Sequence, residues 1–155
     1  MKKTLLLLTF CLSALLAGAQ DFSVRSAGQG QGGRYLVGVT VNVKKKLFTS
    51  AEDLAMRYAV EGVMFNGLMA ADGYGEQKPL IQNPDVKLTK AEFFEAFNRE
   101  GVYKRFASIV PSSLTSMKNK QTKMIETTAT VLVDKEGLQH YLEESKIIEG
   151  FSNLW

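Results

Sequence analysis

Cysteine is nearly absent from this chain of 155 residues, whose one cysteine is Cys11. It lies within the first nineteen residues, which we expect to be removed, so the mature chain would contain no thiol. The lack of thiols excludes disulfides, thiol nucleophiles and thiolate metal sites from that mature chain. Its stability must then rest on an apolar core.

Histidine is equally scarce, because His140 is the only one. It falls in the middle of a predicted helix, and nothing in the sequence places a nucleophile beside it, so we predict no Ser-His-Asp catalytic triad. A metal site would need oxygen ligands, and the one local cluster is Asp72, Glu76, Asn83 and Asp85. Their spacing does not follow an EF-hand calcium loop. We therefore predict no catalytic residue, no cofactor and no metal.

Long hydrophobic runs are missing after the start of the chain. Residues 5–16 form an apolar run, preceded by two lysines and followed by Ala-Gly-Ala. This order is typical of a secretory signal peptide. At about 12 residues the run is shorter than the roughly 20 that a membrane-spanning helix needs. We predict a signal peptide over 1–19, cleavage near Ala19, export to the periplasm or cell surface, and no transmembrane span.

A lipid anchor on Cys11 is not expected. Lipoprotein leaders carry a small residue just before the modified cysteine, and here that position is Phe10. Cys11 also comes so early that only a very short apolar run precedes it. We interpret it as an apolar leader residue.

Strong net charge is lacking too. Without the leader, 17 basic residues face 16 acidic ones, a formal charge of +1. Lysines do cluster at 44–46 and at Lys118, Lys120 and Lys123. Nucleic-acid binding domains usually carry a net basic charge and interleave it with exposed aromatics, so we predict no nucleic-acid partner. Lysines near strand ends more often protect a sheet edge from pairing.

Two pairs of neighbouring carboxylates, Glu92 with Glu95 and Glu143 with Glu144, are the candidates for glycoside hydrolysis. The first pair lies in the first turn of a predicted helix, where acidic side chains stabilise the helix dipole. The second pair lies in a solvated run. Dipole and solubility account for both pairs without a reaction.

Gly28, Gly30 and Gly33 match the G-x-G-x-x-G spacing of dinucleotide-binding loops. That loop needs a strand before it and a helix after it. Here a processed terminus comes before the glycines and a strand comes after them, so we predict no nucleotide site. Residues 20–33 are small and polar with little periodicity, which indicates a flexible N-terminal arm.

Hydrophobic periodicity then predicts a strand and two helices. Alternating valines over residues 35–43 indicate a strand with one buried face. A helix begins after the cap Ser50 and stops at Gly67. Thr89 and Glu92 have the spacing of a capping box, which predicts the start of a second helix.

The last part of the chain predicts two strands and a helix. The strands lie within 103–110 and 122–133, joined by a polar hairpin connection, and Asp134 caps the final helix. The order β-α-α-β-β-α predicts a two-layer α+β domain over 34–155, with helices covering a small mixed sheet of three strands, or four. We expect the first long helix to pack on the face of the strand that carries the valines.

The connection over residues 68–88 is unusually long. Connections of about 20 residues within compact domains tend to be functional or disordered. Two aromatics, Phe151 and Trp155, also follow the last helix, and they either fold back onto the core or contact a partner. We therefore predict partner contacts at Asp72, Tyr74, Glu76 and Trp155, and at a sheet edge.

Four segments, GGRYLVGVTVNVKKK, AEDLAMRYAVEGVMFNG, QKPL and TATVLVDKEGLQHYLEESKIIEGF, together resemble small secreted proteins of Bacteroidota of unknown function. The leader ending LLAGAQ is similar to leaders common there. The layout is loosely similar to small periplasmic modules in flagellar, curli-export and cell-wall-synthase accessory proteins. These resemblances imply an exported α+β module, but layout does not transfer function, and they carry no catalytic residue onto this chain.

The leading hypothesis is an exported, non-catalytic envelope module that binds an envelope protein or forms a homo-oligomer. The alternative is a small envelope hydrolase or carbohydrate-binding protein that uses carboxylates and tyrosines. The alternative predicts a concave pocket with at least two convergent acidic groups.

Overall fold

The computed structural model describes residues 22–44 and 50–149. In chain order, its elements are β1 (Phe22–Gln29), β2 (Arg34–Lys44), α1 (Ala51–Glu61), the π-helical turn η1 (Gly62–Asn66), α2 (Asp85–Thr89), α3 (Ala91–Arg99), the 3-10 helix η2 (Val102–Arg105), β3 (Ala107–Ile109), β4 (Thr115–Lys118), β5 (Met124–Asp134) and α4 (Lys135–Glu144). The predicted α+β class is confirmed.

One five-stranded sheet organises the molecule. Its strands follow the order β1-β2-β5-β3, and β4 pairs with β5 beside β3. All these strand pairs are antiparallel, so the predicted mixed sheet of three or four strands is wrong. The two strands that the pattern did not predict are β1 and β4.

Strand β1 occupies the region predicted as a flexible arm over residues 20–33. It pairs with β2 from Phe22 to Gln29, with a register shift between Ser26 and Gly28. Its Val24 side chain is only 7% exposed and packs against Gly62 of η1. The prediction of a flexible arm is therefore corrected for residues 22–29, because tertiary packing holds a segment whose own periodicity is weak.

Strand β4 lies within the stretch that was predicted as a polar connection. All four of its residues are exposed, so no apolar alternation marks it. It is a strand because it pairs with β5 from Thr128 to Ile125. The hydroxyls of Ser116 and Thr127 also join across the two strands at 3.0 Å.

The helix boundaries confirm two predicted caps. The Ser50 side chain accepts a hydrogen bond from the Asp53 N–H at 3.1 Å, and the Asp134 side chain accepts one from the Gly137 N–H at 3.0 Å. Gly67 ends the first helical segment with φ of 70°, a left-handed conformation that favours glycine.

The predicted capping box at Thr89 and Glu92 is wrong. Thr89 closes α2, since its hydroxyl donates to the Asp85 carbonyl at 3.1 Å. Helix α3 instead begins at Ala91 after Lys90, which makes no side-chain cap. The spacing of Thr89 and Glu92 matches a capping box, but the Thr89 hydroxyl bonds within the short preceding helix α2 and does not cap α3.

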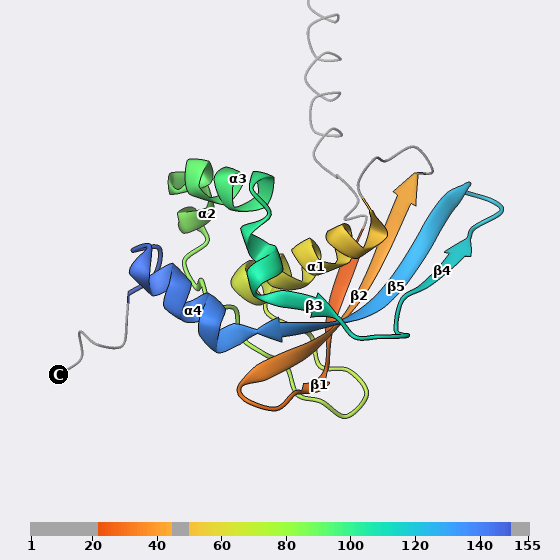
Figure 1. Ribbon diagram of the computed structural model, residues 1–155, viewed down its shortest axis with the longest axis horizontal. Helices are drawn as coiled ribbons and strands as arrows, with labels where there is room; N and C mark the ends of the chain where they lie inside the picture. Colours follow the sequence, from red (N-terminus) through yellow and green to blue (C-terminus); the bar gives the residue numbers. More distant parts are fainter. Residues whose placement is uncertain (1–21, 45–49, 150–155) are drawn as a thin grey trace, which may run out of the picture.

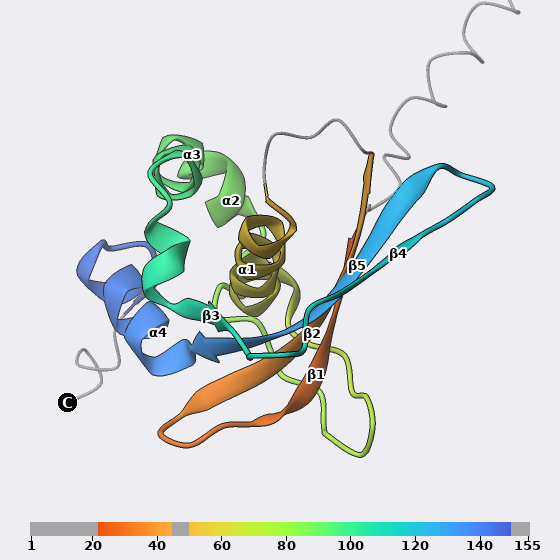
Figure 2. The same ribbon diagram turned by 45° about the vertical axis from the view of Figure 1, so that its right-hand side comes forward.

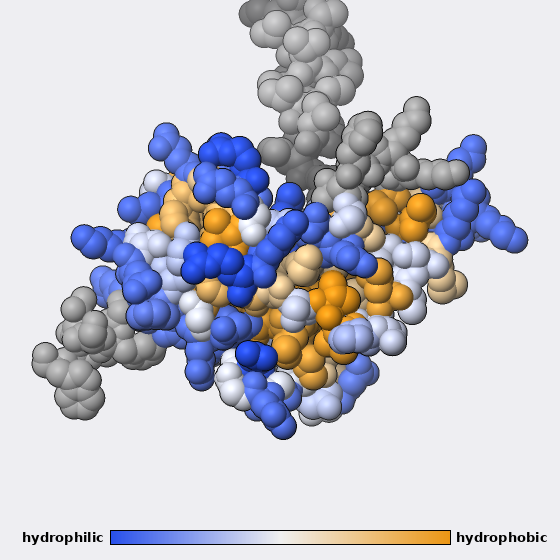
Figure 3. Space-filling model, viewed as in Figure 1, coloured by the Kyte–Doolittle hydropathy of each residue, from blue (hydrophilic) through white to orange (hydrophobic). Residues whose placement is uncertain are grey.

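The helices form a single layer on one side of the sheet (Figures 1 and 2). Helix α1 packs on the valine face of β2, as predicted. The centre of this interface consists of fully buried side chains: Val37, Val39, Val41, Ala59, Val60, Ala129, Val131 and Val133. Partly buried apolar side chains such as Val43 and Ile109 pack against this core. Figure 3 shows apolar surface between hydrophilic rims on the side of the molecule that Figure 1 presents.

Aromatic rings tie the remaining helices together. Phe97 of α3 lies among Phe93, Phe106 and Tyr141, with ring centroids 6.0 to 6.4 Å apart. Leu138 and Leu142 of α4 are fully buried. This cluster fixes α4 against α3 and η2. Within 22–44 and 50–149, no helix combines the length and apolar character that crossing a bilayer requires.

Candidate functional site

The second face of the sheet carries none of the labelled helices and is called the open face here (Figure 2). Residues that are paired across neighbouring strands share a face. By this register the open face carries Ser23, Arg25, Leu36, Gly38, Thr40, Asn42, Ser108, Thr115, Met117, Met124, Glu126, Thr128, Thr130 and Leu132. Hydroxyl side chains therefore form a row across four strands at Ser23, Thr40, Thr128 and Thr115.

The long connection begins with a short β-hairpin over residues 68–77. Leu68 and Gln77 exchange backbone hydrogen bonds at 2.8 and 2.9 Å. The turn at its tip has Asp72 and Gly73 at φ of 52° and 84°, and Ala71 and Tyr74 exchange backbone hydrogen bonds around it. Two successive positive φ angles match the turn preferred in tight hairpins.

This 68–77 hairpin is attached to the outer edge of β1. The Ser26 N–H donates to the Met69 carbonyl at 2.9 Å, and Arg25 forms a parallel bridge with Met69. The hairpin therefore covers part of the edge that β1 would otherwise expose. It places the tip residues beside the open face.

The predicted contact residues do not all meet. The Tyr74 ring and the Leu36 side chain both lie against Gly28, where an added Cβ would be 3.4 Å from each. Asp72 reaches Arg25 of the open face at 4.0 Å. Glu76 is exposed on the returning arm of the hairpin. Trp155 lies outside the described residues.

Large exposed apolar side chains concentrate along two borders of the open face. Four such residues stand out among the described ones: Met69 (67% exposed), Tyr74 (48%), Met117 (72%) and Leu88 (78%). Met69 and Tyr74 belong to the 68–77 hairpin on the β1 side, and Met117 lies on β4 at the opposite side. Only Leu88, on α2, lies elsewhere.

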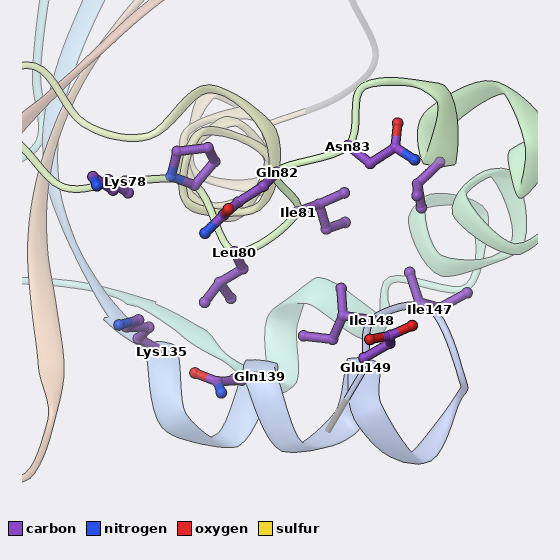
Figure 4. A pocket seen from close by; sticks show the side chains of 12 residues that line it. Lys78, Leu80, Ile81, Gln82, Asn83, Lys135, Gln139, Ile147, Ile148 and Glu149 are labelled. Carbon is purple, nitrogen blue, oxygen red and sulfur yellow. The ribbon is translucent and has the colours of Figure 1, made fainter. Parts of the chain in front are cut away.

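A second feature is a cleft of about 670 Å³ between the end of the connection and α4, called the cleft here. Its lining residues are Lys78, Pro79, Leu80, Ile81, Gln82, Asn83, Val86, Lys135, Gln139, Ile147, Ile148 and Glu149. Figure 4 shows Leu80 descending from the connection and Ile148 extending towards the same space. The backbone fixes one wall, because the Leu80 and Ile81 N–H groups donate to the Val63 and Met64 carbonyls at 3.1 and 2.8 Å.

The charges of the cleft do not suit acid–base catalysis by two carboxylates. Lys78 and Lys135 lie at one end of it, while Glu149 lies at the other (Figure 4). Glu149 is the one carboxylate among the lining residues. The alternative function requires two convergent acids, and this cleft does not supply them.

The remaining candidates from the sequence have structural roles or lie apart. His140 is exposed on α4, and its Nε2 lies 3.3 Å from the carboxylate of Glu144, four residues further along the helix. Asn83 accepts a hydrogen bond from the Asp85 N–H at 3.0 Å in the turn that leads into α2. Throughout residues 22–44 and 50–149, no group of three or more acidic, histidine or cysteine side chains is arranged to hold a metal ion.

Among the described residues, Lys104 has a shifted pKa, and the shift arises from a contact between two helical segments. The Lys104 ammonium donates to Asp53 at 2.8 Å, linking η2 to the first turn of α1. This hydrogen bond, partly opposed by desolvation, raises the pKa of Lys104 above its usual 10.5. The ion pair is formed by groups outside both the open face and the cleft.

Several site residues had no signal in the sequence. Leu36 and Met117 are separated by some eighty positions, and only the strand register places both on the open face. Lys78 and Lys135 likewise meet at the cleft because the connection folds back onto α4. The alternation of small polar residues in β2 was the one pattern that could have indicated an uncovered face.

Comparison of the chain with protein-family models, curated proteins and solved structures finds no match. Its function must therefore be inferred from its own residues and surfaces.

Proposed function

We propose that this chain is an exported, non-catalytic module of the cell envelope whose open face binds a protein, either an envelope partner or a second copy. Export is supported by the leader pattern over residues 1–19, which lies outside the described residues. The resemblance to small secreted Bacteroidota proteins agrees with the same location.

The observation that carries the proposal is the position of the exposed apolar side chains. Three of the four large ones border the open face, two on the 68–77 hairpin and one on β4. Tyrosine, methionine and arginine are enriched in protein interfaces, and Tyr74, Met117 and Arg25 supply them here. A polar face bordered by such side chains suits a protein–protein interface that contains bridging water molecules.

The open face also offers hydrogen-bonding groups in a fixed array. The row of hydroxyls at Ser23, Thr40, Thr128 and Thr115 lies on neighbouring strands, which are about 4.8 Å apart in a sheet. A hydroxyl can both donate and accept, so the row tolerates different partner groups. These hydroxyls would fix the position of a partner on the sheet, while most of the binding energy would come from the apolar side chains at its borders.

Non-catalytic action is supported by the chemistry of the cleft. Its one carboxylate and two lysines do not form an acid–base pair of the kind that hydrolysis of a glycoside uses. The open face likewise pairs Arg25 with Asp72 at its border instead of gathering acids.

A binding measurement with matched variants tests the proposal. We expect the double substitution Tyr74→Ala with Met117→Ala to weaken binding of the captured envelope partner, or self-association, by at least tenfold. Loss of two interface side chains at about 1 kcal/mol or more each accounts for that factor. Affinity capture from the native envelope and sedimentation equilibrium provide the two readouts.

Leu88→Ala is the control, because among the described residues Leu88 is the one large exposed apolar side chain away from the open face. It should leave binding unchanged. If Leu88→Ala weakens binding while the double variant does not, the interface lies on the helix side and the proposal is wrong.

A further inference from the structure

The cleft presents apolar surface that the described residues leave uncovered. Leu80 and Ile148 are half-buried and extend into it from opposite walls (Figure 4). Its volume of about 670 Å³ lies within the range of cavities that enclose a ligand. Its polar side chains, however, are spread along its length, from Lys78 and Lys135 at one end to Glu149 at the other, and do not converge on one point as they do in small-molecule sites (Figure 4).

The chain itself continues from the rim of this cleft. Glu149 lines the cleft, and residues 150–155 follow it directly. Six residues span about 20 Å when extended, which is enough to lie along a cleft of this size. A segment that starts at the rim needs no long linker to enter.

The sequence of that segment, GFSNLW, matches the lining. Phe151, Leu154 and Trp155 are apolar, and none of the six residues carries a charged side chain. The cleft offers apolar side chains between Gln82 and Gln139. The Gln82 amide and the Gln139 amide oxygen can pair with the backbone of an extended segment, while the Gln139 amide nitrogen donates to Glu143 at 2.9 Å. We propose that residues 150–155 dock into the cleft of their own chain.

Docking within one chain is favoured over docking into a second copy. A short connection holds a segment near its site at an effective concentration in the millimolar range. At micromolar protein, a segment from another molecule competes poorly with that. This docking is independent of partner binding at the open face, since the two surfaces share none of the residues that define them.

Trp155 makes the proposal directly measurable, because it is the only tryptophan in the chain. In the chain that begins at Gln20, we expect its emission to be blue-shifted relative to the urea-unfolded chain. We expect acrylamide to quench it several-fold less than in urea. Both values should stay constant from low to high micromolar protein.

Two substitutions in the cleft locate the docking site. Ile148→Asp should shift the emission to the red and raise the quenching constant to that of the unfolded chain, while the circular dichroism stays native. If Ile148→Asp fails to fold, Gln139→Arg on α4 places a bulky charge in the cleft and should have the same effect. Lys118→Asp on the distant β4 is the control, because this side chain is exposed and belongs neither to the cleft nor to the proposed interface, and it should leave both readouts unchanged.

Three results would overturn the proposal. The first is an emission of the native chain that equals the unfolded one, which would show a solvent-exposed Trp155. The second is protection that grows with protein concentration, which would show docking into a second copy. The third is protection that survives Ile148→Asp or Gln139→Arg in a folded variant, which would place Trp155 on another surface.

Discussion

Val24→Asp is expected to lower the free energy of unfolding by about 3–5 kcal/mol, the usual penalty of an unpaired buried charge. Val24 is 7% exposed, and its side chain packs against Gly62 of η1. Part of the loss should disappear at acidic pH, because burial raises the pKa of the introduced carboxyl and protonation then removes the charge. Urea unfolding followed by circular dichroism at pH 7 and pH 4 measures both effects.

Ser23→Asp is the matched control, one residue away on the exposed face of the same strand. It should change stability by less than about 0.5 kcal/mol. If residues 20–33 were a flexible arm, both substitutions would leave the free energy of unfolding unchanged. Equal and small effects would therefore show that β1 does not contribute to the folded domain.

Phe97→Ala should have a similarly large effect, about 3–5 kcal/mol. Its ring is 2% exposed and lies among Phe93, Phe106 and Tyr141. Truncation leaves a cavity where α3, η2 and α4 meet, and three neighbouring rings lose their contact. The same unfolding measurement reports the loss.

Phe97→Leu provides a graded comparison, since it retains more of the apolar volume and should cost clearly less. Leu88→Ala on the neighbouring helix is the exposed control, with an expected change within about 0.5 kcal/mol. A Phe97→Ala variant as stable as the Leu88→Ala variant would mean that the aromatic cluster does not hold α4 in place.

The elements predicted well are those whose own residues repeat at the right period. The valines of β2 alternate, and the Ser50 and Asp134 caps lie directly before amphipathic helices. Local pattern and tertiary environment agree at these positions, so the sequence alone suffices.

Strands β1 and β4 could not be predicted in the same way. In β1 a buried position is filled by Ser26, which is 3% exposed, and a register shift interrupts the alternation before Gly28. In β4 every residue is exposed, so only its pairing with β5 defines it. Strand propensity depends strongly on such context.

The residues of the open face and of the cleft were likewise predictable only where a local pattern in the sequence marked them. The length of the connection pointed to Asp72 and Tyr74, which the structure places beside the open face. Met117 was missed, because its strand was not predicted. The cleft was missed as well, because two of its walls, residues 78–83 and residues 147–149, are far apart in the sequence and only the fold brings them together.

Site-specific photocrosslinking in the producing cells tests partner binding at the open face most directly. A photoreactive amino acid at Thr40, in the hydroxyl row, should yield a discrete adduct with a partner or a second copy. The same amino acid at Glu95, exposed on α3 of the helix layer, should yield none. Adducts from Glu95 with none from Thr40 would contradict the proposed interface.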